Sequence, residues 1–111
     1  MLFRSNLEIA GDTVMVDTPS ASGKGQKIVR CPKCHVALWS HYARRGTALA
    51  FVRAGSLDDP SAVTPDVHIF TSSKLPWVRL PEGAQAFAEF YDVPKLWPPE
   101  ALARAAAAKE I

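Results

Sequence analysis

Residues 27–42 read KIVRCPKCHVALWSHY, and the fold expected for the chain rests on these residues. Residues 27–30 are apolar enough for a short β-strand, and residues 36–42 alternate apolar and polar side chains as a second strand does. Between the two strands lie Cys31 and Cys34, the only two cysteines of the chain. Cysteines at this spacing form a knuckle that supplies two of the four ligands of a tetrahedral zinc ion. The stretch therefore predicts two strands joined by half of a metal site.

The composition is that of one ordinary soluble domain. The chain has 111 residues, of which 48% are hydrophobic and 22% charged, with a formal net charge of +2. Its basic residues are scattered and form no basic stripe. No apolar run approaches the ~18 residues of a membrane span. The N-terminal residues do not show the basic start, long apolar stretch and small-residue cleavage site of a signal peptide. We expect a cytoplasmic protein that binds neither nucleic acid nor membrane. In a reducing compartment a CxxC pair is more often metal-binding or redox-active than a structural disulfide.

The rest of the chain predicts more strands and then a change of character. We expect strands at residues 13–16, 49–54 and 67–71, a short helix at residues 84–91, an extended linker at residues 93–99 and an alanine-rich helix at residues 100–109. Strands separated by short loops, with helices only at the end, predict an all-β core. We therefore expect one mainly β domain over residues 1–97, followed by an alanine-rich C-terminal helix or tail over residues 98–111.

The residues alone leave four interpretations of the cysteine pair open. A zinc site inside the chain would need two of the three imidazoles, those of His35, His41 and His68, and His35 would have to fold back to reach the ion. A thioredoxin-like redox motif is the second, although Cys34 leads into a strand and not a helix. The third is haem attachment, because the run from Cys31 to His35 matches C-x-x-C-H. The fourth is a pair of idle or buried cysteines.

Several short motifs together resemble one known family. They are the loop at residues 22–25, the knuckle at Cys31 and Cys34, Leu38, the turn at residues 55–60, His68 with the two residues after it, and residues 73–77. In this order and spacing the chain resembles the glutathione-dependent formaldehyde-activating enzymes, which include centromere-protein-V-like proteins. The resemblance covers roughly residues 13–97, the C-terminal two-thirds of a typical member.

The resemblance implies a fold and a chemistry. Members have a β-tent of small antiparallel sheets around zinc, and they are carbon–sulfur lyases that join glutathione and formaldehyde into S-hydroxymethylglutathione. They carry a structural zinc bound by an upstream CxC and a downstream CxxC, and a catalytic zinc bound by an upstream C-x-C-x-x-C. Cys31 and Cys34 match the downstream half of the structural site. The resemblance also implies that His68, Lys74 and Trp77 contact glutathione or another small thiol. The alternative is a purely structural role for each of the three, as a hydrogen-bonded histidine, a solvated lysine and a packing tryptophan.

The chain departs from this pattern before the knuckle, because residues 1–30 contain no cysteine. The CxC half and the catalytic cysteines are therefore absent, and we assign no catalytic residue and expect no catalytic zinc. We expect a truncated reading frame, a fragment or a genuine short form, and a chain that by itself lacks the lyase activity. The alternative is a non-enzymatic homodimer in which Cys31 and Cys34 of two chains bridge one zinc.

Overall fold

The computed structural model describes residues 1–108, so residues 109–111 of the predicted C-terminal helix or tail lie outside the described residues. The chain divides into two compact units. The first consists of residues 1–60 together with the end of the chain from residue 103, and the second of residues 61–102. We describe each unit by itself.

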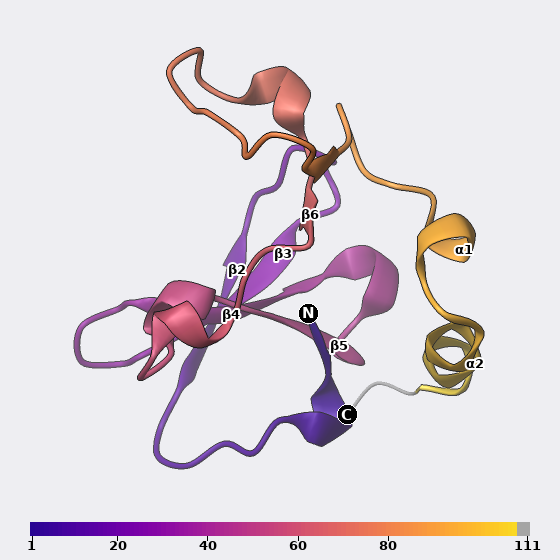
Figure 1. Ribbon diagram of the computed structural model, residues 1–111. Helices are drawn as coiled ribbons and strands as arrows, with labels where there is room; N and C mark the ends of the chain where they lie inside the picture. The colour runs from indigo at the N-terminus through magenta and orange to yellow at the C-terminus, as the bar shows by residue number, and fades with distance from the viewer. Residues whose placement is uncertain (109–111) are drawn as a thin grey trace. The chain divides into compact units, whose positions relative to one another are not determined.

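The first unit is built on an antiparallel sheet of five strands in the order β1-β5-β4-β3-β2 (Figure 1). The strands are β1 (Leu2–Phe3), β2 (Val14–Thr18), β3 (Gln26–Arg30), β4 (Ala37–Tyr42) and β5 (Leu49–Val52). Short 3₁₀ turns follow β1, β4 and β5 at Arg4–Asn6, Ala43–Arg45 and Ala54–Ser56, and a fourth spans Pro60–Ala62. The mainly antiparallel β fold is confirmed, and β3 and β4 are the two predicted strands on either side of the cysteines. The two-residue strand β1 was not predicted, since it is too short to show a period.

The core of the first unit lies on one face of this sheet. Val29, Trp39 and Ala50 are buried there and pack together across β3, β4 and β5. Leu7, Leu38 and Val52 pack against this cluster from its margin. Successive side chains of a strand alternate between faces, so the register that pairs Val29 with Trp39 and Trp39 with Val52 places these three on the same side.

Two hydrogen bonds link Trp39, His41 and Leu49 inside this core, and we call this chain of bonds the relay. The indole Nε1 of Trp39 donates to Nε2 of His41 at 3.1 Å, and Nδ1 of His41 lies 2.8 Å from the carbonyl oxygen of Leu49. An indole nitrogen only donates, so Nε2 must accept and Nδ1 must carry the proton that it gives to Leu49. His41 is only 4% exposed, so these two bonds satisfy a ring that water hardly reaches.

The opposite face of the sheet buries Ser40, whose hydroxyl accepts a hydrogen bond from Nη2 of Arg53 at 2.9 Å. The rings of Tyr42 and Phe51 meet edge to face on the neighbouring strands, with centroids 4.8 Å apart. Both faces of β4 are therefore packed.

The second unit corrects three expectations. Residues 84–91 do not form a helix: Gln85–Ala86 is a short strand, β7, and it pairs in parallel with β6 (Val67–His68). The predicted strand at residues 67–71 is therefore only two residues long, because Phe70 adopts a left-handed backbone (φ 53°) and a 3₁₀ turn follows at Thr71–Ser73. The predicted extended linker instead contains a single helical turn, α1 (Val93–Leu96), with a proline at its N-terminus where no amide donor is needed.

The alanine-rich segment forms helix α2 (Pro99–Ala107). Its last turns belong to the first unit, where the guanidinium of Arg104 lies 4.2 Å from the centre of the Phe3 ring. Arg104 also donates to the side chains of Ser5 and Asn6. The methyl groups of the helix bury little surface, so this one arginine supplies its specific attachment to the N-terminal segment.

The relay predicts that Trp39→Phe destabilises the fold. The change removes the donor of His41 Nε2 inside the core, and an orphaned buried acceptor costs ~1–3 kcal/mol. Urea unfolding should show a lower midpoint with an unchanged slope. Trp77→Phe is the matched control, because Trp77 is 74% exposed and its replacement should change the midpoint little. Equal midpoints for the two variants would contradict the role of the relay.

Candidate functional site

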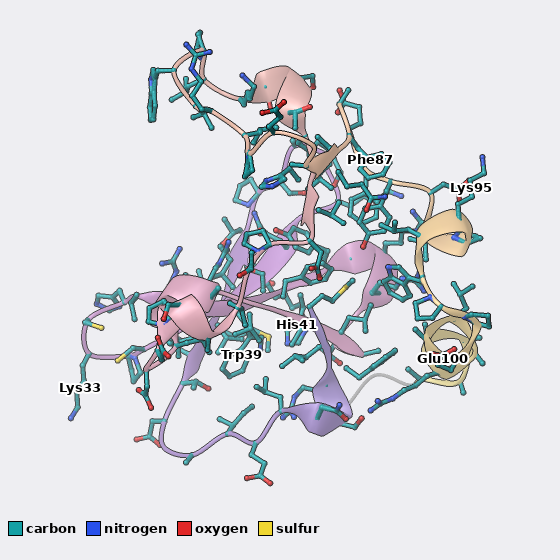
Figure 2. All side chains as sticks on the ribbon, in the orientation of Figure 1. Lys33, Trp39, His41, Phe87, Lys95 and Glu100 are labelled. Carbon is teal, nitrogen blue, oxygen red and sulfur yellow. The ribbon has the colours of Figure 1, made fainter. Side chains whose placement is uncertain are left out.

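The two cysteines sit in a tight turn between β3 and β4. The amide of Cys31 donates to the carbonyl oxygen of Val36 at 3.1 Å, and the amide of His35 donates to that of Cys31 at 2.9 Å. Nη1 of Arg30 donates to the carbonyl oxygen of His35 at 2.8 Å. Figure 2 shows Lys33 at the outer end of this turn, with its side chain directed away from the sheet. Three hydrogen bonds thus hold a turn whose tip faces solvent.

The backbone of the turn is not that of a simple hairpin. His35 has φ +63°, in the left-handed region, and the pairing of β3 with β4 shifts register between Val29 and Arg30. Histidine enters the left-handed region more readily than most residues that carry a Cβ. The left-handed residue and the shifted register let the chain turn back into β4 directly after Cys34.

This turn favours a thiolate at Cys31. The amides of Cys34 and Lys33 hydrogen-bond to its sulfur, and with the Cys34 thiol they lower the pKa of the Cys31 thiol below its ordinary value, against a smaller opposing effect of burial. Hydrogen bonds from amides favour the charged form of a group because they take the place of water around the anion. Cys31 is half-buried and Cys34 exposed, and neither is in a disulfide.

The donor set fits half of a tetrahedral zinc site. Thiolate sulfurs that accept amide hydrogen bonds are ordinary zinc ligands, and two cysteines supply two of the four positions. Among residues 1–108, no group of three or more histidine, cysteine, aspartate and glutamate side chains is gathered closely enough to hold a metal ion. His41 is also committed elsewhere, since both of its nitrogens are in the relay. The described residues therefore offer Cys31 and Cys34 and no third ligand beside them.

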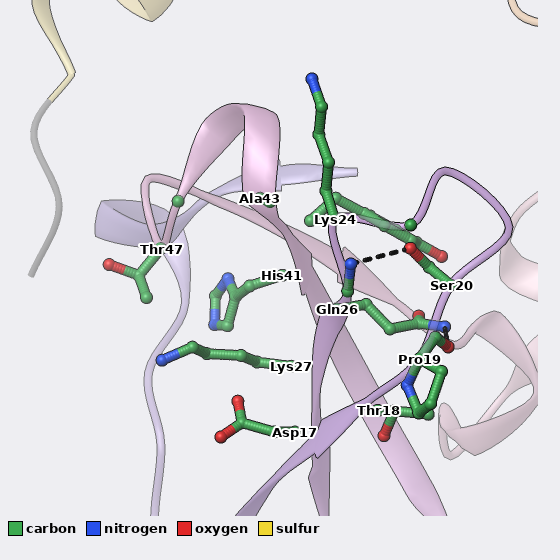
Figure 3. A pocket seen from close by; sticks show the side chains of 14 residues that line it. Asp17, Thr18, Pro19, Ser20, Lys24, Gln26, Lys27, His41, Ala43 and Thr47 are labelled. Atoms are coloured by element: carbon green, nitrogen blue, oxygen red, sulfur yellow. Dashed lines mark hydrogen bonds between the residues drawn. The ribbon is translucent and has the colours of Figure 1, made fainter.

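A pocket of about 620 Å³ lies at the other end of the same strands (Figure 3). Its walls come from the end of β2, the loop that leads into β3, the end of β4 and the turn that follows. Its charged side chains are Asp17, Lys24 and Lys27, and His41 lines it as well.

The residues implied as substrate contacts lie in the second unit. His68 is half-buried in β6, and its carbonyl oxygen accepts the amide of Phe87 at 2.9 Å. Lys74 is exposed, and its ammonium donates to the carbonyl oxygen of Val78 at 3.3 Å. Trp77 is 74% exposed, more than any other large apolar side chain in residues 1–108. These positions leave the side chains of His68 and Trp77 accessible and give Lys74 a partner within its own loop.

Comparison with protein families identifies the chain. The model of the glutathione-dependent formaldehyde-activating enzyme family matches residues 1–73 of the 111-residue sequence.

The chain belongs to this family. No curated protein matches it, and no solved structure matches it. The match includes Cys31, Cys34 and His68, whereas Lys74 and Trp77 lie just beyond it. Membership indicates a function related to glutathione and to the activation of formaldehyde, in a family that is generally associated with zinc. Among the described residues, no helix is long and apolar enough to cross a membrane.

The pocket of this family member was not foreseen from the sequence. The loop at residues 22–25 counts only as one of the motifs of the resemblance, and neither Asp17 nor Lys27 is a candidate site residue from the sequence. The signal available was their position: once β2 and β3 are paired through that loop, the two residues face each other across the hairpin. Predicting this arrangement requires the register in which β2 pairs with β3, and the sequence alone does not give that register.

The turn predicts a pH dependence for alkylation of Cys31. In a Cys34→Ser variant, which keeps the amide of residue 34, iodoacetamide should label Cys31 with a midpoint below the ~8.5 of a free thiol. Because the folded pKa is lower than the unfolded one, Cys31 contributes stability that is complete above the unfolded pKa and is lost as pH falls through the folded pKa. The same variant unfolded in urea is the control and should titrate higher. Equal midpoints in the folded and unfolded chain would contradict the amide contacts.

Proposed function

We propose that this chain takes part in the glutathione–formaldehyde chemistry of its family as a glutathione-binding domain. We also propose that residues 1–111 by themselves do not catalyse the reaction of glutathione with formaldehyde. One observation carries the proposal: the family match includes a well-formed turn with Cys31 and Cys34, and these are the only thiols of the sequence. In the family reaction the sulfur of glutathione adds to the carbonyl carbon of formaldehyde, and the thiol proton ends on the new hydroxyl oxygen.

Cys31 and Cys34 suit a structural role better than a catalytic one. A catalytic zinc keeps one position open and is held by three protein ligands, and it polarises carbonyls as a Lewis acid. The described residues bring two thiols together with no third ligand. A zinc ion bound at Cys31 and Cys34 would link the end of β3 to the segment that leads into β4. The zinc knuckle and the β-tent arrangement are proposals that the resemblance supports, and a cytoplasmic location is a separate proposal.

The remaining family positions are proposed contacts for glutathione or its adduct. His68 and Trp77 are accessible in the second unit, and an indole with so much exposed surface is suited to pack against a small ligand. Lys74 is the weakest of the three, because its ammonium already donates to Val78.

The proposal predicts no protein-dependent turnover. With zinc, glutathione and formaldehyde, the purified chain should consume formaldehyde no faster than a Cys31→Ser/Cys34→Ser double variant. The physical reason is that two thiolates do not supply the ligands of an open metal site. The consumption of formaldehyde measures this directly. Turnover that depends on the protein and disappears in the double variant would overturn the proposed inactivity, whereas the glutathione-binding role is tested separately by calorimetric titration.

A second candidate function is non-enzymatic, and the exposure of the turn favours it. Cys34 and Lys33 lie at a solvent-facing tip, so a second copy of the chain can approach both cysteines. Two turns related by a two-fold axis would supply four thiolates to one zinc. Four thiolates on Zn²⁺ leave a net charge of −2, which Arg30 and Lys33 of both copies offset. The chain would then be a zinc-bridged binding module.

This candidate predicts one zinc per two chains. Metal analysis and light scattering should find a dimer that chelation or Cys31→Ser converts to monomer. His35→Gly is the matched control: it removes the only adjacent imidazole and suits the left-handed backbone, so zinc and dimer should both persist. A monomer that holds one zinc, or a loss of zinc in His35→Gly, would contradict the bridge.

A further inference from the structure

The pocket at the end of β2 and β3 has a charge pattern that neither the family match nor the cysteine turn explains. Asp17, Lys27 and His41 are direct partners across three adjacent strands, because Asp17 pairs with Lys27 and Lys27 pairs with His41. Directly opposed residues of neighbouring strands point to the same face. Figure 3 shows the three side chains in a row on one side of the pocket, with Lys24 rising from the loop in a different direction.

The charged groups of this row do not pair with one another. Although Asp17 and Lys27 are opposed, no ion pair joins them in the described part of the chain. The ammoniums of Lys24 and Lys27 likewise have no hydrogen-bond partner among residues 1–108. An opposed aspartate and lysine that stay apart leave a carboxylate and an ammonium ready for a ligand that carries both charges.

The walls around these charges are held in place. His41 is neutral and fixed by the relay, so it forms a wall of the pocket and adds no charge. The loop is tied to itself: the amide of Gly25 donates to the hydroxyl of Ser20 at 3.1 Å, and the amide of Gly23 donates to the carbonyl oxygen of Ser20 at 3.0 Å. A rim held by such hydrogen bonds loses little conformational freedom when a ligand binds.

We infer that this pocket binds the charged ends of glutathione, an inference that rests on the glutathione-related function proposed above. At neutral pH the tripeptide carries two carboxylates and one ammonium, and the pocket carries two ammoniums and one carboxylate. Lys27 receives the carboxylate of the γ-glutamyl amino-acid head and Asp17 receives its ammonium, because these two side chains lie side by side in the row. Lys24 lines the same pocket from the loop and points away from the row, so it is left for the carboxylate at the far, glycine end of the tripeptide. The volume of about 620 Å³ lies within the range of small-ligand sites.

The location of the pocket separates binding from metal chemistry. Cys31 comes directly after β3 and four residues beyond Lys27, a separation of roughly 13 Å at the rise of a β-strand. Glutathione held by Lys27 and Asp17 therefore needs neither zinc nor Cys31. His68, Lys74 and Trp77 of the second unit are the competing positions for the tripeptide. Among the described residues the ammonium of Lys27 has no partner, whereas that of Lys74 donates to Val78, and this difference favours the pocket.

Calorimetric titration of the zinc-free chain with glutathione tests the inference. S-methylglutathione should bind as well as glutathione, because the thiol makes no contact in the pocket. Lys27→Gln should weaken binding about five-fold or more, the effect of losing one charged contact of ~1 kcal/mol. Lys95→Gln removes the same charge from an exposed site on α1 and should leave the dissociation constant unchanged.

Asp17→Asn supplies the second arm of the test. It should weaken binding of glutathione but not of N-acetylglutathione, which lacks the ammonium. Amide shifts confined to residues 17–27 and 41–47 would support the pocket. Binding that is unchanged by Lys27→Gln, or that is weakened by Lys74→Gln instead, would overturn the pocket and leave the proposed function standing. A chain that binds no glutathione at millimolar concentration would contradict both.

Discussion

The hydrogen bond from the indole of Trp39 to His41 is the interaction on which the first unit depends. It joins the indole of Trp39 to the imidazole of His41 on the same strand. The second hydrogen bond of His41, to the carbonyl oxygen of Leu49, links β4 to the start of β5. The relay lies on the same face of the sheet as Val29 and Ala50 and is nearly shut off from water. Because buried polar atoms must be paired, the relay sets the alignment of β4 as firmly as the apolar contacts do.

One hairpin carries two chemically different ends. At one end the turn after β3 presents Cys31 and Cys34 with amides directed at sulfur, a setting for a soft metal ion. At the other end Asp17 and Lys27 stand opposed beside the wall formed by His41, a setting for a small zwitterion. The rigid strands between them keep the two ends apart.

The fold of the first unit was largely predictable from the sequence, and that of the second was not. β3 and β4 are marked by apolar residues on both sides of the cysteine turn, and their packing is local to one hairpin. The helix expected at residues 84–91 failed because the aromatic spacing there serves ring contacts: Phe90 stacks on Tyr91 at 4.2 Å, and Phe87 lies 6.0 Å from Tyr91. Helical periodicity and such a cluster produce the same pattern in a short segment.

Residue type and spacing along the chain were enough to identify the thiol pair, its position between two strands and the family. The folded chain was needed to show that His41 is a neutral member of the relay and so not a metal ligand, and that Asp17 and Lys27 face each other in a pocket. The physical reason is register: which side chains meet across a sheet depends on hydrogen-bonded pairing between segments, and a shift of one residue would have turned every one of them to the other face.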